Sequence, residues 1–552
     1  MRLTHFNCTT CMIEVDARSF RLDRQLAVGL VAIALSVLAL QLSSLFIFPQ
    51  PNGLRWFGDE TWLMSEAKSQ ITTGVVRYPL ALGSTLEQSK GLVLSMTWLS
   101  SCLYGAPSAL IPGDPIEIGR SVTAALGVLL CASLFVCARK LGASHSSAAL
   151  AVLLLVCSRS FFYSSHSCRT DLLAGLIVLV TVTLLMLRAK QSTQPSGRWW
   201  LLFGAVIAFL SVSSSVHLLT LLLPVSTYFV WRLGALSRSR NVYFALAGSL
   251  AVFIILVSAY YVAIGNLTLF TPTSAGHSQF HDVLSSIPIL RPFSRSVQVS
   301  NLVIRMKQIA IEAPQVYLIV PLLAVAMRSS RQRLLSPSSI AFPISIVICS
   351  WLFLEGSEVN YLVQILPLLL LAVAILFSRL TEHSPRIKYS LIVLLALSVG
   401  GLGVRDALPV RSTARNIDRS NERAIAQIGS AVAQTWRGKG KPRVCTEPTS
   451  LSRLSQISSI ETMTDHFISF PTREEPLDSF ILRHHIDYFV LYDSPTYPKN
   501  RQRDDPFYRE VVRLGSLEAT IIGTSGDVGR DHFCRSDWMD TLLLFRINYG
   551  GK

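Results

Sequence analysis

Apolar segments long enough to cross a lipid bilayer recur through the first three quarters of this 552-residue chain. A membrane-spanning helix needs about 20 predominantly apolar residues, and a soluble fold rarely holds many such segments. Charged residues make up only 15% of the sequence, whereas soluble proteins contain about 25%. The sequence therefore predicts a polytopic α-helical membrane protein. We expect about 11 transmembrane helices, near residues 25–48, 119–138, 146–163, 171–188, 199–214, 216–231, 241–263, 315–328, 338–354, 360–378 and 389–406.

The formal net charge of +16 comes mainly from short loops between the apolar segments. From Arg405 onward, basic and acidic residues nearly balance. Cytoplasmic loops of membrane proteins collect Lys and Arg, so the excess indicates topology and not a nucleic-acid partner. The arginines before the first span place the N-terminus inside, and the later short basic loops then fall on the same side. Between the first span and Arg405, all acidic residues fall outside except Glu382.

Two long outer segments and a polar C-terminal region complete the predicted organisation. After Val404 the chain becomes polar, and short β-rich runs alternate with helix-like stretches, which is typical of a small α/β domain. We expect a cytoplasmic tail over residues 1–24, a transmembrane domain over 25–408 with outer segments 49–118 and 264–314, and a soluble extracytoplasmic α/β domain over 409–552.

The cysteines give one prediction and one open question. Cys445 and Cys534 are the only cysteines in the outer C-terminal region, where oxidation is permitted, so we expect a disulfide between them. Cys8 and Cys11 form a lone CxxC motif. It fits a zinc or redox site, or a dispensable tail.

Two adjacent carboxylates, Asp59 and Glu60, follow the first span at the outer membrane surface. A carboxylate in partly apolar surroundings suits a general base that deprotonates a nucleophile attacking a sugar. An ordinary solvated acid pair at the start of a helix is the other interpretation.

Two further outer features carry polar residues suited to an anionic ligand. Lys90 heads an apolar stretch at the outer interface, where its ammonium could meet a lipid phosphate. The outer turn after the third span contains His166, Arg169 and Asp171. Arg169 could neutralise phosphate while Asp171 orients it or caps the next helix, or the two residues could form a purely structural ion pair.

These motifs together resemble the GT-C superfamily of membrane glycosyltransferases, and most closely its branch of protein O-mannosyltransferases and lipid A aminoarabinose transferases. The resemblance covers about residues 20–410, with Gly91 standing where the family usually has Pro. It is carried, in order, by Asp59-Glu60, Ala67, Gly74, Lys90, Arg120, Arg169-x-Asp171 and Asn360-Tyr361 before Pro367.

The resemblance implies a sugar donor on a polyprenyl or dolichyl phosphate, with transfer to a protein, lipid or glycan acceptor on the outer face. Direct displacement would invert the anomeric centre. By this similarity Asp59 is the catalytic base and Glu60 supports it, while Lys90, Arg169 and Asp171 contact the donor phosphate. His166, Asn360 and Tyr361 are assigned to the lipid or substrate pocket.

The outer segment 264–314 contains Arg291 and Arg295. It either rests on anionic lipid headgroups or covers the donor pocket, with one of these arginines reaching phosphate.

We expect no required cofactor; a Mg²⁺ or Mn²⁺ ion bridging carboxylates and phosphate is the alternative. The expected location is a bacterial inner membrane. A transporter or flippase for a lipid-linked or anionic solute is the competing class, but it predicts internal repeats and midplane charges, and the sequence shows neither.

Overall fold

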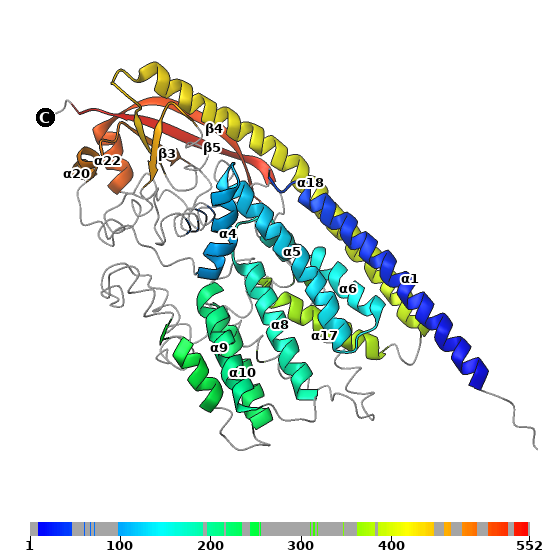
Figure 1. Ribbon diagram of the computed structural model, residues 1–552. Coiled ribbons are helices and arrows are strands. Elements are labelled where there is room, and N and C mark those ends of the chain that lie inside the picture. The colour runs from blue at the N-terminus through cyan, green and yellow to red at the C-terminus, as the bar shows by residue number, and fades with distance from the viewer. Residues whose placement is uncertain are drawn as a thin grey trace, which may run out of the picture.

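A computed structural model gives the arrangement of the helices and strands (Figure 1). The structure describes residues 9–46, 60, 64, 67, 71, 98–190, 196–214, 217–234, 243–252, 254–255, 310, 313–314, 317, 346, 362–380, 385–446, 457–464, 477–493, 506–527 and 535–549.

The larger part of the described chain is a bundle of helices. Within these described ranges, four helical segments are long and apolar enough to cross a membrane, and the bent pair α6 (His145–Val156) and α7 (Arg159–Ser165) forms a fifth if it is one span. The protein is an integral membrane protein. The predicted spans at 315–328 and 338–354 lie almost entirely outside the described residues, so the expected total of about 11 stays a prediction. The helices are α1 (Thr9–Leu42), α4 (Trp98–Leu110), α5 (Pro115–Lys140), α6 (His145–Val156), α7 (Arg159–Ser165), α8 (Asp171–Lys190), α9 (Gly197–Ser214), α10 (His217–Gly234), α17 (Leu366–Leu380) and α18 (Pro385–Thr435).

Short polar side chains fix where the helices at the outer end begin. Asp114 caps α5, because its carboxylate accepts a hydrogen bond of 2.8 Å from the Ile116 N–H, and Pro115 follows at the first helical position. Ser158 caps α7 in the same way, accepting from the Phe161 N–H at 3.2 Å. Its extended backbone separates α6 from α7, which bend by 67°. The span predicted over 146–163 therefore corresponds to two helices with a bend at Ser158.

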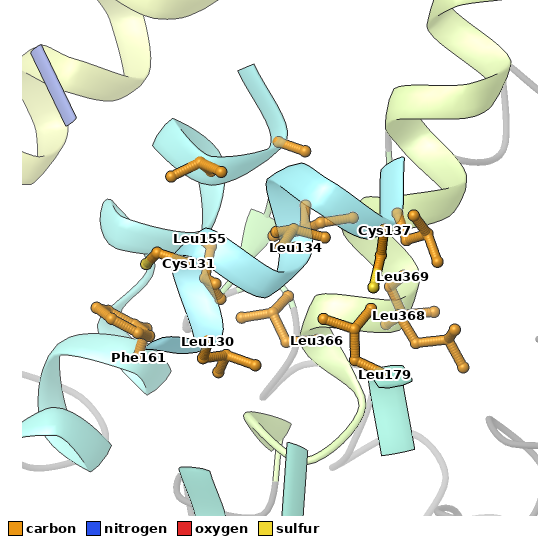
Figure 2. Close-up of a cluster of buried hydrophobic side chains, with 14 of the residues drawn as sticks. Leu130, Cys131, Leu134, Cys137, Leu155, Phe161, Leu179, Leu366, Leu368 and Leu369 are labelled. Carbon is orange, nitrogen blue, oxygen red and sulfur yellow. The ribbon is translucent and has the colours of Figure 1, made fainter. Parts of the chain in front are cut away.

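The bundle core consists of apolar side chains from most of the described helices, and Figure 2 shows the part of it around α5. α5 lies at its centre and contacts α6, α7, α8 and α17. α5 also carries exposed apolar side chains such as Val128 and Leu129, so it is hydrophobic around its circumference, as expected for a helix of a membrane bundle. The close-up labels Leu130, Cys131, Leu134 and Cys137 of α5, Leu155 of α6, Phe161 of α7, Leu179 of α8, and Leu366, Leu368 and Leu369 of α17.

The C-terminal region contains a mixed five-stranded sheet with strand order β2-β1-β3-β5-β4. The first three strands pair in parallel, and β5 pairs antiparallel with both β3 and β4. Its elements are β1 (Arg443–Thr446), β2 (Glu461–Thr464), α20 (Leu477–His484), β3 (Tyr488–Asp493), α22 (Pro506–Leu514), β4 (Gly515–Asp527) and β5 (Arg535–Ile547).

Side chains alternate between the two faces of this sheet, as strand geometry requires. Tyr488 and Val490 of β3 pack with Ile428 of α18 on one face. Phe489, between them in sequence, packs on the other face with Phe480 of α20. The sheet is therefore covered by α18 on one side and by α20 and α22 on the other.

Helix α18 is 51 residues long and connects the two regions without a break. It contacts α1 and α6 in the bundle and β4 in the sheet, and it runs beside α1 for much of its length (Figure 1). The domain boundary predicted between residues 408 and 409 falls inside this helix.

Candidate functional site

A fully buried ion pair joins the first outer segment to the start of α5. The Arg120 Nε donates to Glu60 Oε1 at 3.1 Å, and its Nη2 donates to Glu60 Oε2 at 2.9 Å. Both side chains have 0% exposure. This bidentate geometry is the strongest form of the Arg–carboxylate interaction.

Backbone groups complete the surroundings of this pair. Arg120 Nη1 donates to the Leu45 carbonyl at 3.1 Å, just beyond the end of α1. The Cys168 N–H, in the outer turn after α7, donates to Glu60 Oε1 at 2.8 Å. The Glu60–Arg120 pair therefore ties together the end of α1, the start of α5, the outer turn and the segment that carries Asp59.

A second polar cluster lies where the outer turn enters α8. The Arg169 Nε donates to Asp171 Oδ2 at 2.8 Å, and the Gln364 amide donates to Asp171 Oδ1 at 2.7 Å. Asp171 is the first residue of α8, and its exposure is 3%. Each of its carboxylate oxygens therefore has a hydrogen-bond donor from a different part of the chain.

Tyr104 of α4 fixes the backbone of this turn. Its hydroxyl donates to the Arg169 carbonyl at 2.7 Å and lies 3.1 Å from the Thr123 Oγ1. The tyrosine is fully buried, and this burial raises the pKa of its hydroxyl, so it stays a hydrogen-bond donor. Neither Tyr104 nor Gln364 is among the residues that the sequence predicted for the site.

His166 lies in the same turn, and each of its ring nitrogens lies close to a backbone carbonyl, with Nδ1 2.8 Å from that of Phe162. Its Nε2 lies 2.8 Å from the Gln41 carbonyl of α1, and its Nδ1 lies 3.0 Å from the Ser165 hydroxyl. Burial lowers the pKa of the imidazole to about 4, which favours the neutral form. Its assignment to a lipid or substrate pocket stays a prediction.

Several predicted site residues lie outside the described residues, and the sequence-based roles of these residues remain predictions. They are Asp59, Lys90, Arg291, Arg295, Asn360, Tyr361 and Cys534. Cys445 is buried in β1, and its disulfide with Cys534 stays a prediction. What the structure does bring together, at one end of the bundle, is Glu60, Arg169 and Asp171.

Gln364 and Tyr104, which the sequence did not predict as site residues, had weak sequence signals. Gln364 is a polar residue inside an apolar run, and its Oε1 is buried without a hydrogen-bond partner among the described residues. Such a residue in a membrane bundle is a candidate functional position. Tyr104 has no comparable signal, because an aromatic residue in an apolar stretch is ordinary core. Within the described part of the chain, no group of three His, Cys, Asp or Glu side chains could hold a metal ion.

The fold and this end of the bundle define a class of protein, a polytopic membrane protein with a polar cluster where helices meet the surface. The sequence profile of the family described as "Dolichyl-phosphate-mannose-protein mannosyltransferase" matches residues 97–261. No curated protein sequence matches the chain.

Solved structures extend the likeness to almost the whole chain. ArnT from Cupriavidus metallidurans bound to undecaprenyl phosphate is similar with a TM-score of 0.56 and 14% identity, over 94% of this chain and 97% of that chain. The apo state of the same protein gives a TM-score of 0.52 and 16% identity over the same shares. The chain therefore has the GT-C fold, and the resemblance to the GT-C superfamily seen in the sequence motifs is confirmed.

Proposed function

We propose that this protein transfers a sugar from a polyprenyl-phosphate or dolichyl-phosphate donor to an acceptor on the outer face of its membrane. The GT-C fold supports the reaction class. The matched family is described by a dolichyl-phosphate sugar donor, and the similar ArnT structure holds undecaprenyl phosphate. We place the protein in a bacterial inner membrane with its N-terminus in the cytoplasm, in keeping with the charge pattern of the loops.

The buried Glu60–Arg120 pair is the observation that carries this proposal. Both carboxylate oxygens of Glu60 accept hydrogen bonds from Arg120. Glu60 is therefore a positioning residue, and the neighbouring Asp59 is the proposed base. The same Glu60 oxygen that binds Arg120 Nε also accepts from the Cys168 N–H, one residue before Arg169. The Glu60 carboxylate thus connects the segment next to the proposed base with the turn that carries Arg169, a proposed phosphate contact.

The proposed reaction is a single displacement at the anomeric carbon. An acceptor oxygen or nitrogen attacks this carbon while Asp59 takes the proton from the acceptor. The bond from the anomeric carbon to the phosphate oxygen breaks, and the phosphate leaves with the electron pair. The configuration inverts, because the nucleophile and the leaving phosphate occupy opposite faces.

Cationic side chains would stabilise the negative charge that develops on the phosphate. Arg169 is the described candidate, and Lys90 with Arg291 or Arg295 would complete the set. A preorganised donor of this kind typically contributes about 3 kcal/mol to the stability of a transition state. Asp171, held by Gln364, fixes the Nε side of the Arg169 guanidinium.

In vitro transfer from a panel of radiolabelled polyprenyl-phosphate sugars tests the proposal. Wild type should transfer at least one sugar, and Asp59→Asn should abolish transfer at unchanged protein abundance. Glu117→Gln, which removes an exposed carboxylate from the first turn of α5, is the control and should retain activity. Equal activity of Asp59→Asn and wild type would refute the base, and movement of the intact donor across vesicles without transfer would favour a flippase.

Metal dependence is tested in the same assay. We propose that no divalent ion is required, so transfer should continue after exhaustive chelation. Loss of activity that Mg²⁺ or Mn²⁺ restores would show instead that carboxylates such as Asp59 hold a metal.

A further inference from the structure

Gln364 is a fully buried amide whose nitrogen and oxygen have different surroundings. The residue has 0% exposure and lies in the turn just before α17. Its Nε2 donates a hydrogen bond of 2.7 Å to Asp171 Oδ1, whereas its Oε1 has no hydrogen-bond partner among the described residues. A buried acceptor without a partner is unfavourable, so a native structure that keeps one needs a reason for it.

The orientation of this amide follows from the charge of its neighbour. An ionised carboxylate only accepts hydrogen bonds, so the NH₂ group of Gln364 has to face Asp171. Asp171 is bound in turn by Arg169, whose Nε donates to its other oxygen at 2.8 Å. The Gln364 Oε1 therefore lies on the side of the amide carbon that is turned away from the Asp171 carboxylate.

The backbone at Gln364 is packed closely against α8. A Cβ added at Gly175 would lie 2.6 Å from the Val363 carbonyl oxygen and 3.5 Å from the Gln364 Cα. Gly175 follows Asp171 by four residues, so both residues lie on the side of α8 that meets the turn before α17. The lack of a side chain at Gly175 thus permits the close approach that brings the Gln364 amide to Asp171.

The connection to Arg169 indicates which part of a donor could meet the Gln364 oxygen. Arg169 is the described candidate for the donor phosphate, and it shares the Asp171 carboxylate with Gln364. In a polyprenyl-phosphate sugar, the sugar is joined directly to that phosphate. An ionised phosphate oxygen has no hydrogen to donate, whereas each hydroxyl of a sugar has one. The group of such a donor that can satisfy the Gln364 Oε1 is therefore a hydroxyl of the sugar.

The proposed displacement favours the donor sugar over the acceptor as the ligand of this oxygen. The acceptor would attack the face of the anomeric carbon that lies opposite the leaving phosphate. Gln364 belongs to the same hydrogen-bonded cluster as Arg169, the candidate phosphate contact. It would therefore lie on the phosphate side of the sugar and away from the acceptor.

We propose that the Gln364 Oε1 accepts a hydrogen bond from a hydroxyl of the donor sugar, while the NH₂ group of the same side chain holds Asp171. Gln364 is then a residue that determines sugar specificity, because a site built to bind a hydroxyl rejects an analogue that lacks it. This inference rests on the proposed sugar transfer and adds to it a side chain that recognises the sugar.

Monodeoxy analogues of the transferred sugar, each attached to polyprenyl phosphate, test the inference with the full-length protein. In wild type, removal of one particular hydroxyl should lower kcat/KM about tenfold to a hundredfold. Gln364→Met removes the amide at a similar length, so the ratio of kcat/KM between the parent sugar and that deoxy analogue should fall to about one. Gln364→Asn keeps an amide that is one carbon shorter, and it should lose most of the ratio as well.

Two control variants separate sugar binding from support of Asp171. Gln41 of α1 is a matched buried amide, because its Nε2 donates to the Val156 carbonyl at 2.9 Å and its Oε1 also has no partner among the described residues. Gln41→Met should keep the wild-type ratio. Gln364→Glu/Asp171→Asn exchanges the carboxylate and the amide, which restores a hydrogen bond between them and leaves an acceptor oxygen at position 364. It should keep most of the ratio at a lower rate.

The possible outcomes distinguish this inference from the proposed function. If wild type transfers no sugar from any donor of the panel, both are wrong. If wild type transfers a sugar but uses every deoxy analogue equally well, only the inference is wrong, and this result needs no variant that folds. The inference is also wrong if Gln364→Met and Gln364→Asn keep the wild-type ratio, because Gln364 would then act only through Asp171.

Discussion

Two ion pairs at the same end of the bundle differ in how completely the protein closes around them. The Glu60–Arg120 pair has both side chains at 0% exposure. The Arg159–Asp406 pair leaves 22% and 15% of its side chains exposed. Both pairs connect segments far apart in the sequence, so the difference lies in the surroundings and not in the kind of contact.

This difference indicates which of the two ion pairs the fold can lose at a small cost in stability. A charge left alone in a closed interior costs several kcal/mol, because no water reaches it. A partly hydrated pair gains little over its hydrated components. Breaking the Glu60–Arg120 pair, next to Asp59, should therefore cost much stability. Breaking the Arg159–Asp406 pair, which attaches α18 to α7, should cost little.

The largest expected effect comes from breaking the closed pair. Arg120→Leu leaves the Glu60 carboxylate buried beside a methyl group, and we expect a loss of about 3–5 kcal/mol in the free energy of unfolding. Thermal unfolding of the detergent-solubilised protein measures it. Arg120→Leu combined with Glu60→Leu removes both charges and should recover part of the loss. An Arg120→Leu variant as stable as wild type would contradict the conclusion that the pair is shielded from water.

A smaller effect should follow from adding one methyl group where α4 meets the first outer segment. A Cβ on Gly105 would lie 2.1 Å from the Ala67 carbonyl oxygen, which is backbone and cannot turn aside. We expect Gly105→Ala to cost about 3 kcal/mol, at the upper end for overpacking. Gly401 of α18 has nothing within 4 Å of the same atom, so Gly401→Ala should be neutral or slightly stabilising.

His166 is another group that the protein encloses at this end of the bundle, and its burial should make the stability depend on pH. The unfolded chain binds this proton near pH 6.5, and the folded chain binds it near pH 4. Between these values the unfolded state holds more protons, so stability falls as the pH decreases. We expect a loss of about 2 kcal/mol between pH 7 and pH 5.

His166→Gln should remove most of that slope in thermal unfolding measured across this pH range. His485→Asn, at an exposed position with a positive φ that Asn tolerates, is the control and should keep the slope. A slope that persists in His166→Gln would assign the titration to another group.

The sequence predicted the parts of this fold that depend on local pattern. The β-rich runs Arg443–Cys445, Tyr488–Tyr492 and Leu542–Ile547 lie in β1, β3 and β5. The proximity of Arg169 and Asp171 also followed from their spacing, because two residues in one turn can meet without help from the rest of the chain.

Features that depend on distant contacts or on competing local signals were not predicted. Sixty residues separate Glu60 from Arg120, and nothing local indicates that they bind each other. The break between α6 and α7 depends on the Ser158 cap within a run that otherwise looks like one span. The change to polar composition after Val404 marks a change of environment, but α18 continues through it and past Pro409, although proline disfavours a helix interior.

The smallest effect is expected at the Arg159–Asp406 pair, and it gives the most direct comparison with Glu60–Arg120. Arg159→Gln and Asp406→Asn should each cost about 1 kcal/mol or less, since water can reach both groups. A double-mutant cycle with these two variants should give a coupling energy below about 1 kcal/mol, whereas the Glu60–Arg120 cycle should give about 3 kcal/mol, the upper range for contacting residues. If the two coupling energies were equal, the exposure of an ion pair would not determine its contribution at this end of the bundle.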